Sequence, residues 1–249
     1  MTLCVYALTG GAVRVSARGL AGERLQVYAH GAVAAVAGRL SRAPDPSPEL
    51  LRRYDGAIRR LAESLPAVLP VRFGTCFDDP AELAFVLRSR GASLGRAVAH
   101  VRNRVQMTVR LIEDPLQRAR PGEAGAAKPD SQARGGAPSV SPGSSSPRSP
   151  DSERPQRARI SGTAYLQGRA EAVARANEIP GFEPVRDAVR RWVRDERVER
   201  RGAIASVYHL IPRTAADGYR RAIGRAAAGG GLRVVVSGPW PAYAFADTL

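Results

Sequence analysis

A proline-, serine- and glycine-rich segment in the middle of the chain is the feature that most constrains how the chain can fold. Residues 115–158 contain eight Pro, eight Ser and five Gly, and no aromatic residue. A segment of this composition buries too little apolar surface to offset the entropy that is lost on ordering. We therefore predict a disordered linker at 115–158, which divides the chain into an N-terminal domain, residues 1–114, and a C-terminal domain, residues 159–249.

The N-terminal part carries the hydrophobic patterns of both strands and helices. Short apolar or alternating runs predict strands at 2–8, 24–30, 68–72 and 104–112. Helical spacing and capping residues predict helices at 32–42, 49–64, 80–90 and 92–103. In the last strand we expect one set of alternate residues to face the core, namely Val105, Met107, Val109 and Leu111, and the other set to face solvent, namely Gln106, Thr108 and Arg110.

The C-terminal part shows a similar mixture, so that both parts are predicted to be α+β. Helices are expected at 162–177, 183–200 and 212–228, and strands at 203–211 and 232–237. The chain then closes with GPWPAYAFADTL, which is too rich in proline to form a helix or a central strand.

The charge of the chain leaves two kinds of partner open. Lys and Arg number 38 against 23 Asp and Glu, which gives a formal net charge of +15. A chain this basic is typical of a nucleic-acid-binding protein, but it would also be attracted to an acidic protein surface. Nucleic-acid binders usually gather their charge on one face, whereas here the Arg residues are spread along the chain. Nucleic-acid binding is therefore the alternative function and not the first.

The sequence lacks the motifs of common enzymes and cofactor sites. There is no nucleophile elbow, no phosphate-binding loop and no dinucleotide fingerprint, so we expect neither catalysis nor a bound cofactor. The three histidines are isolated, and Cys4 and Cys76 are too few for a disulfide scaffold and too far apart for a metal knuckle, so no metal site is predicted. No run of 18 apolar residues or signal peptide is present, and we expect a cytoplasmic protein without a membrane span.

Two segments stand out from the rest by their residue types. The first, VLPVRFGTCF, runs from an apolar strand into Arg72, Phe73, Gly74 and Thr75. One reading is a core strand that ends in a tight turn at Gly74. The other is a functional site, because an Arg and a Phe fixed at a strand end are well placed to bind a partner.

The second segment is the aromatic tail SGPWPAYAFAD. It contains Trp240, Pro241, Tyr243 and Phe245 close to the chain terminus. Termini usually fray unless they are tied down, so the tail either packs onto the body of the protein or awaits a partner. Trp, Tyr and Phe are suitable anchors for an interface.

These same segments resemble the signature blocks of a known family. VLPVRFGT at 68–75 and SGPWPAYAF at 237–245 are similar to blocks of the gas vesicle protein family GvpL/GvpF. NRVQMTVRL at 103–111 and SGTAYLQGR at 161–169 resemble two further blocks, in the same order. The chain departs from the family pattern at Gln106, where the family usually has Glu, and in the tail, where Ala242 and Ala244 replace the usual Pro and Ser. The resemblance does not separate the L type from the F type.

The resemblance implies a non-enzymatic accessory protein of gas vesicle formation, located in the cytoplasm and at the gas vesicle. Its implied partners are the hydrophobic shell protein GvpA and other accessory proteins, with no membrane contact. The implied fold is an N-terminal α+β domain, ferredoxin-like in style, followed by a C-terminal mixed domain with long helices. If the strand at 104–112 lies at a sheet edge, it could pair with a strand of a partner.

Overall fold

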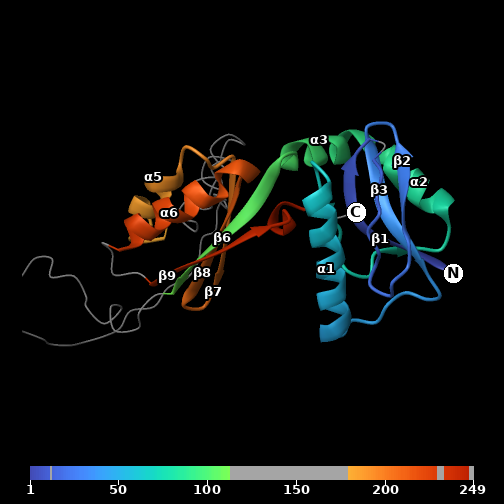
Figure 1. Cartoon of the computed structure of the whole chain (residues 1–249), viewed down its shortest axis with the longest axis horizontal. Coiled ribbons are helices and arrows are strands. Elements are labelled where there is room, and N and C mark those ends of the chain that lie inside the picture. Colours follow the sequence, from blue (N-terminus) through green and yellow to red (C-terminus); the bar gives the residue numbers. More distant parts are fainter. Residues whose placement is uncertain (12, 113–178, 229–232, 247–249) are drawn as a thin grey trace, which may run out of the picture. The chain divides into compact units, whose positions relative to one another are not determined.

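The computed structural model describes residues 1–11, 13–112, 179–228 and 233–246 (Figure 1). The predicted linker at 115–158 and the predicted helix at 162–177 lie outside these residues. The predicted domain boundaries, at 114/115 and 158/159, also lie outside the described residues, and they stay predictions. Contacts join the described residues before position 113 and those after position 178 into one unit.

The first sheet is antiparallel and is centred on β1 (Thr2–Gly10). Its strand order is β2 (Leu25–His30), β3 (Val33–Leu40), β1 and β4 (Leu69–Pro70), and the short β5 (Cys76–Phe77) also pairs with β1. The strands predicted at 2–8 and 24–30 are confirmed. The strand predicted at 68–72 is reduced to the two residues of β4.

The predicted helix at 32–42 is wrong, because these residues form β3. Six consecutive residues of β3, from Val33 to Gly38, are buried between β1 and β2. Alanine favours a helix in isolation, but its small side chain also fits a strand that is covered on both faces.

Three helices cover the two faces of this sheet. Helix α1 (Pro48–Ser64) packs on the face that carries Cys4 and Tyr6, whereas α2 (Pro80–Ser89) and α3 (Gly91–Val101) pack on the face that carries Leu3 and Val5. This division follows from the alternation of side chains along β1. The predicted capping is confirmed at α2, where the Asp79 carboxylate accepts a hydrogen bond from Ala81 N at 2.7 Å.

The second sheet is also antiparallel. One of its strands, β6 (Arg104–Ile112), comes from the first half of the sequence, and the other three come from the second half. The order is β7 (Asp195–Arg201), β8 (Ile204–Pro212), β6 and β9 (Arg233–Trp240). Helices α5 (Glu183–Val189) and α6 (Ala216–Ala227) pack together against it, and a short 3₁₀ turn, η1 (Arg213–Ala215), precedes α6 (Figure 1). The family resemblance implied a ferredoxin-like arrangement for the first half of the chain. A ferredoxin-like sheet is built from a βαββαβ sequence of elements, and its first and third strands lie in the centre. The second sheet has this order, because β6 and β8, its first and third strands along the chain, lie in the centre.

Three expectations about this sheet are corrected. The helix predicted at 183–200 ends at Val189, and Asp195–Arg201 instead pairs with β8 as a highly charged edge strand. Gln106 and Thr108 are 4% and 5% exposed and do not face solvent. Because β6 lies between β8 and β9, it has no free edge and cannot pair with a strand of a partner.

The structure confirms the predicted α+β class, with two antiparallel sheets and helices packed on each. Among the described residues, no helix is both long and apolar enough to cross a membrane.

Candidate functional site

The segment Arg72–Thr75 forms a tight turn between β4 and β5. The Thr75 N–H and hydroxyl both donate to the carbonyl of Arg72, at 3.2 and 2.9 Å. Gly74 has φ +81°, a backbone conformation that favours glycine. The Thr75 carbonyl accepts from Val5 N at 2.9 Å, which ties the turn to β1.

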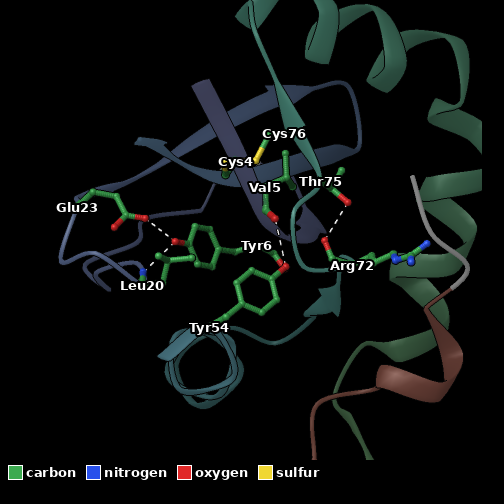
Figure 2. Close-up of a disulfide and its surroundings, with 9 residues drawn as sticks. All are labelled: Cys4, Val5, Tyr6, Leu20, Glu23, Tyr54, Arg72, Thr75 and Cys76. Atoms are coloured by element: carbon green, nitrogen blue, oxygen red, sulfur yellow. Dashed lines mark hydrogen bonds between the residues drawn. A yellow bond between two sulfur atoms is a disulfide. The ribbon is translucent and has the colours of Figure 1, made fainter. Parts of the chain in front are cut away.

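Helix α1 and a disulfide hold this turn from both sides (Figure 2). The buried Tyr54 hydroxyl donates to the carbonyl of Val71 at 2.7 Å, and its ring meets Phe73 edge-on with 5.3 Å between ring centres. Cys76 lies directly opposite Cys4 in the strand pairing, and the two form a disulfide. The cysteine count did not predict this pairing, because it depends on the register of strands that are far apart in sequence.

The side chain of Arg72 points away from the disulfide and is exposed (Figure 2). Within the described residues its guanidinium makes no hydrogen bond or ion pair. The reading of this segment as a core strand that ends in a turn at Gly74 therefore accounts for Phe73, Gly74 and Thr75, and Arg72 is the member that faces outwards.

The aromatic tail packs onto the body of the protein as far as Ala246. After edge strand β9 it forms a 3₁₀ turn, η2 (Tyr243–Phe245). Phe245 is 4% exposed and joins the apolar core of the first sheet together with Ala242. The Ala244 N–H donates to the buried Gln106 side-chain oxygen at 2.7 Å. The segment is neither helix nor central strand, as its prolines predicted.

The outer side of the tail is tied to helix α1 by polar contacts. The Tyr243 hydroxyl donates to one carboxylate oxygen of Asp55 at 2.5 Å, and Arg59 Nε donates to the other at 2.7 Å. The Arg59 guanidinium lies over the Trp240 ring, 4.3 Å from its centre. Burial raises the pKa of the Tyr243 phenol above its ordinary value, and the hydrogen bond to Asp55 raises it further. The phenol therefore stays neutral and donates.

A groove of about 240 Å³ lies between these two elements, and we call it the tail–α1 groove. The tail contributes residues 239–242, α1 contributes Arg59, Ala62 and Glu63, and the other lining residues are Val68, Arg104, Val105 and Arg213. Of the predicted site residues, Trp240 and Pro241 line the groove, whereas the turn Arg72–Thr75 does not. The sequence did not single out Arg59, Arg104 or Arg213, because they are three of many Arg residues and converge only in the fold.

A second polar cluster lies in the other sheet, around the fully buried His209. Its Nε2 is 2.7 Å from a Glu196 carboxylate oxygen and its Nδ1 is 2.5 Å from the Tyr219 hydroxyl, and Arg186 pairs with Glu196 at 3.0 Å. Burial alone would raise the pKa of Glu196, but His209 and Arg186 together hold it below its ordinary value. The cluster joins α5, α6, β7 and β8. Among the described residues no group of three or more potential ligands could hold a metal ion.

Comparison with known proteins gives one consistent result. The model of the family described as gas vesicle synthesis protein GvpL/GvpF matches residues 3–247. The crystal structure of GvpF from Anabaena sp. PCC7120 is similar with a TM-score of 0.68 and 12% identity, over 100% of this chain and 97% of that one. GvpF from Microcystis aeruginosa gives a TM-score of 0.67 and 11% identity, over 99% of each chain.

At such low identity these two structures show a shared fold and no more. Among curated proteins, none matches the chain significantly in sequence. The family match covers both signature segments, the turn at Arg72–Thr75 and the tail. The chain belongs to the GvpL/GvpF family of gas vesicle synthesis proteins.

Proposed function

We propose that this chain is a non-enzymatic accessory protein of gas vesicle formation, which acts in the cytoplasm by binding the hydrophobic shell protein GvpA and other accessory proteins. The observation that carries the proposal is the family match over residues 3–247. Binding of these partners is the part that the proposal adds.

The physical need for such a protein follows from the character of a hydrophobic wall subunit. Before assembly, a subunit of this kind exposes apolar surface and strand edges, and it would aggregate through both. A protein that binds the subunit weakly, and then releases it to the growing wall, would keep it available.

The tail offers a suitable contact surface. Its buried side, Ala242 and Phe245, fixes it to the core, while Tyr243 remains 36% exposed and Trp240 is partly exposed. Aromatic side chains held in place in this way are effective interface anchors, because little conformational freedom is lost on binding. The net charge of +15 would add attraction to acidic partners, which salt weakens.

A pull-down with a co-expressed shell subunit, at low and at high salt, tests the proposal. We expect the wild-type chain to retain the subunit and Trp240→Ala to retain about tenfold less. Phe85→Ala is the matched control, since Phe85 is an aromatic residue on α2 that is 63% exposed, and it should retain as much as the wild type.

A parallel sample with nucleic acid addresses the alternative function. No feature of the described residues specifically favours nucleic-acid binding. Retention of nucleic acid but not of the shell subunit would contradict the proposal, and so would equal retention of the subunit by both variants if circular dichroism shows that both are folded.

A further inference from the structure

We propose that the tail–α1 groove is a binding site for an acidic segment of a partner protein, in which a carboxylate side chain stands beside an apolar one. The inference rests on the proposed function, because the partner would be a protein that the chain meets during gas vesicle formation. It adds the location of the contact and the chemistry of the segment.

The size of the groove suits a side chain and not a cofactor. Its volume of about 240 Å³ is below the roughly 300–1,000 Å³ of pockets that bind small molecules. Its apolar lining includes Ala62, Val68 and Val105, and the Trp240 ring and Pro241 are contributed by the tail. An apolar side chain that enters the groove would leave water and contact these apolar groups, which is favourable.

Two guanidiniums at the groove are available to a carboxylate. Arg104 donates to the carbonyl of His100 at 2.5 Å, and Arg213 donates to the carbonyl of Leu65 at 3.3 Å. These carbonyls hold the side chains without neutralising them. No ion pair is recorded for either guanidinium in the part of the chain that the structure describes. A guanidinium has five N–H donors, so each can still bind a carboxylate oxygen.

The third guanidinium has a different role. Arg59 already pairs with Asp55, at 2.6 Å between Nη2 and Oδ2, and it lies over the Trp240 ring. Asp55 is also the acceptor for Tyr243. This chain of contacts fixes the aromatic wall of the groove before any ligand arrives, which lowers the entropic cost of binding.

The lining favours a peptide over a nucleic acid. Glu63 is part of the lining, and its negative charge disfavours a continuous run of phosphates more than a single carboxylate that two guanidiniums can bind. A nucleic-acid groove usually continues along the strand with many cations and several stacking rings, whereas this groove offers two available guanidiniums and one indole. One carboxylate with an apolar neighbour matches both the charge and the surface.

Fluorescence anisotropy with two labelled peptides tests the site. The probe is fluorescein-labelled Gly-Glu-Leu-Phe-Glu-Gly-amide, and the matched peptide carries Gln in place of both Glu. We expect the wild type to bind the Glu peptide about tenfold more tightly than the Gln peptide, with the difference lost at high salt.

Variants locate the binding in the groove. Arg213→Gln and Trp240→Ala should each weaken binding of the Glu peptide about tenfold. Arg52→Gln is the matched control, because Arg52 is an exposed arginine of α1 outside the groove lining, and it should bind as the wild type does. Thermal unfolding establishes that each variant is folded. Equal binding of both peptides, no binding, or unchanged binding by the folded Arg213→Gln variant would overturn the site.

The same variants separate this inference from the proposed function. If the wild type and Arg213→Gln both retain the shell subunit in a pull-down while the Glu peptide does not bind, the groove proposal fails and the proposed function stands. If the Glu peptide binds in the groove but no shell subunit is retained, the proposed function fails and the site stands. The third outcome concerns the alternative ligand. If a short single-stranded oligonucleotide displaces the Glu peptide from the wild type and does not bind Arg213→Gln, the ligand of the groove is a nucleic acid and the peptide proposal is overturned.

Discussion

The side-chain amide of Gln106 is shared between the second sheet and the tail. Its oxygen accepts a hydrogen bond from the Ala244 N–H at 2.7 Å, and its nitrogen donates to the Thr108 hydroxyl at 3.2 Å. Gln106 is 4% exposed, so both ends of a buried amide are satisfied within the protein. Gln106 is therefore one of the residues that fix the tail to the body of the protein.

We predict that Gln106→Ala loosens the tail. The change leaves the partly buried Ala244 N–H without its acceptor, which should lower the free energy of unfolding by about 1–3 kcal/mol. Urea unfolding measures the loss, and hydrogen exchange should show faster exchange at Ala244. Gln26→Ala, at an exposed position of β2, is the control and should change stability by less than about 0.5 kcal/mol. Unchanged exchange at Ala244 would show that the Gln106 contact does not hold the tail.

Replacement of two glycines by alanine should shift stability in opposite directions. Gly74 has φ +81° and open space around it, so Gly74→Ala adds backbone strain alone and should cost about 1–2 kcal/mol. Gly56 lies within α1, where an added methyl would meet only the flexible tip of Arg60, and Gly56→Ala should raise stability by about 0.5–1 kcal/mol. Thermal unfolding measures both. A stabilising Gly74→Ala would mean that the turn does not have this conformation in solution.

The disulfide should make a measurable contribution to stability. It joins residues that are 72 apart in sequence, so it restricts a long loop of the unfolded chain. The double variant Cys4→Ser/Cys76→Ser should lose about 2–4 kcal/mol in urea unfolding. Reductant should destabilise the wild type and leave the double variant unaffected. A wild type that is insensitive to reductant would argue that the two thiols are not paired.

The cluster around His209 predicts a stability that falls in acid. The folded-state pKa of Glu196 is lowered from its ordinary value of 4.5. A lowered pKa adds stability that is fully present above this ordinary value and is lost as the pH falls through the folded-state value. At pH 7, Glu196→Gln should therefore cost about 1.5–3 kcal/mol, as expected for hydrogen bonds to a charged group.

The pH dependence of this effect provides its test. Urea unfolding at a series of pH values should show that the deficit of Glu196→Gln shrinks as the pH falls towards 3. Glu63→Gln, at an exposed carboxylate of α1, should stay within about 0.5 kcal/mol of the wild type at pH 7. A deficit of Glu196→Gln that is constant with pH would show that the charge of this carboxylate is not what stabilises the cluster.

The sequence predicted the elements whose own pattern is strong. The apolar strand β1, the alternating strand β6 and the capped helices α1 and α2 lie close to their expected positions. In each of these the local residue pattern agrees with the position in the fold, so that propensity and burial point to the same structure.

The errors arose where the position in the fold overrides the local pattern. β3 is rich in alanine and looks helical, but it is held between two strands. The helical pattern of α5 was extended into the residues of β7, where it is weak. The pairing of these residues with β8 decides that they form a strand. Gln106 is polar and on the outward side of β6, yet the tail covers it. None of these contacts is local in sequence.

Part of the candidate site could be predicted from the sequence. Trp240, Pro241 and Tyr243 could be identified from their residue types and crowding near the terminus. Their partners could not, because Asp55, Arg59 and Arg213 come from other elements and meet the tail only after folding. For the same reason the Cys4–Cys76 disulfide was not foreseen.

The measurement that tests the central claim most directly is the aggregation of the shell subunit in the presence of the purified chain. Shell protein diluted out of denaturant is followed by light scattering, with increasing amounts of wild-type chain. We predict that the wild type suppresses the rise in scattering at close to an equal molar ratio, and that Trp240→Ala suppresses it much less while Phe85→Ala acts as the wild type does. A rise in scattering that the wild-type chain leaves unchanged would contradict its role as an assembly partner of the shell protein.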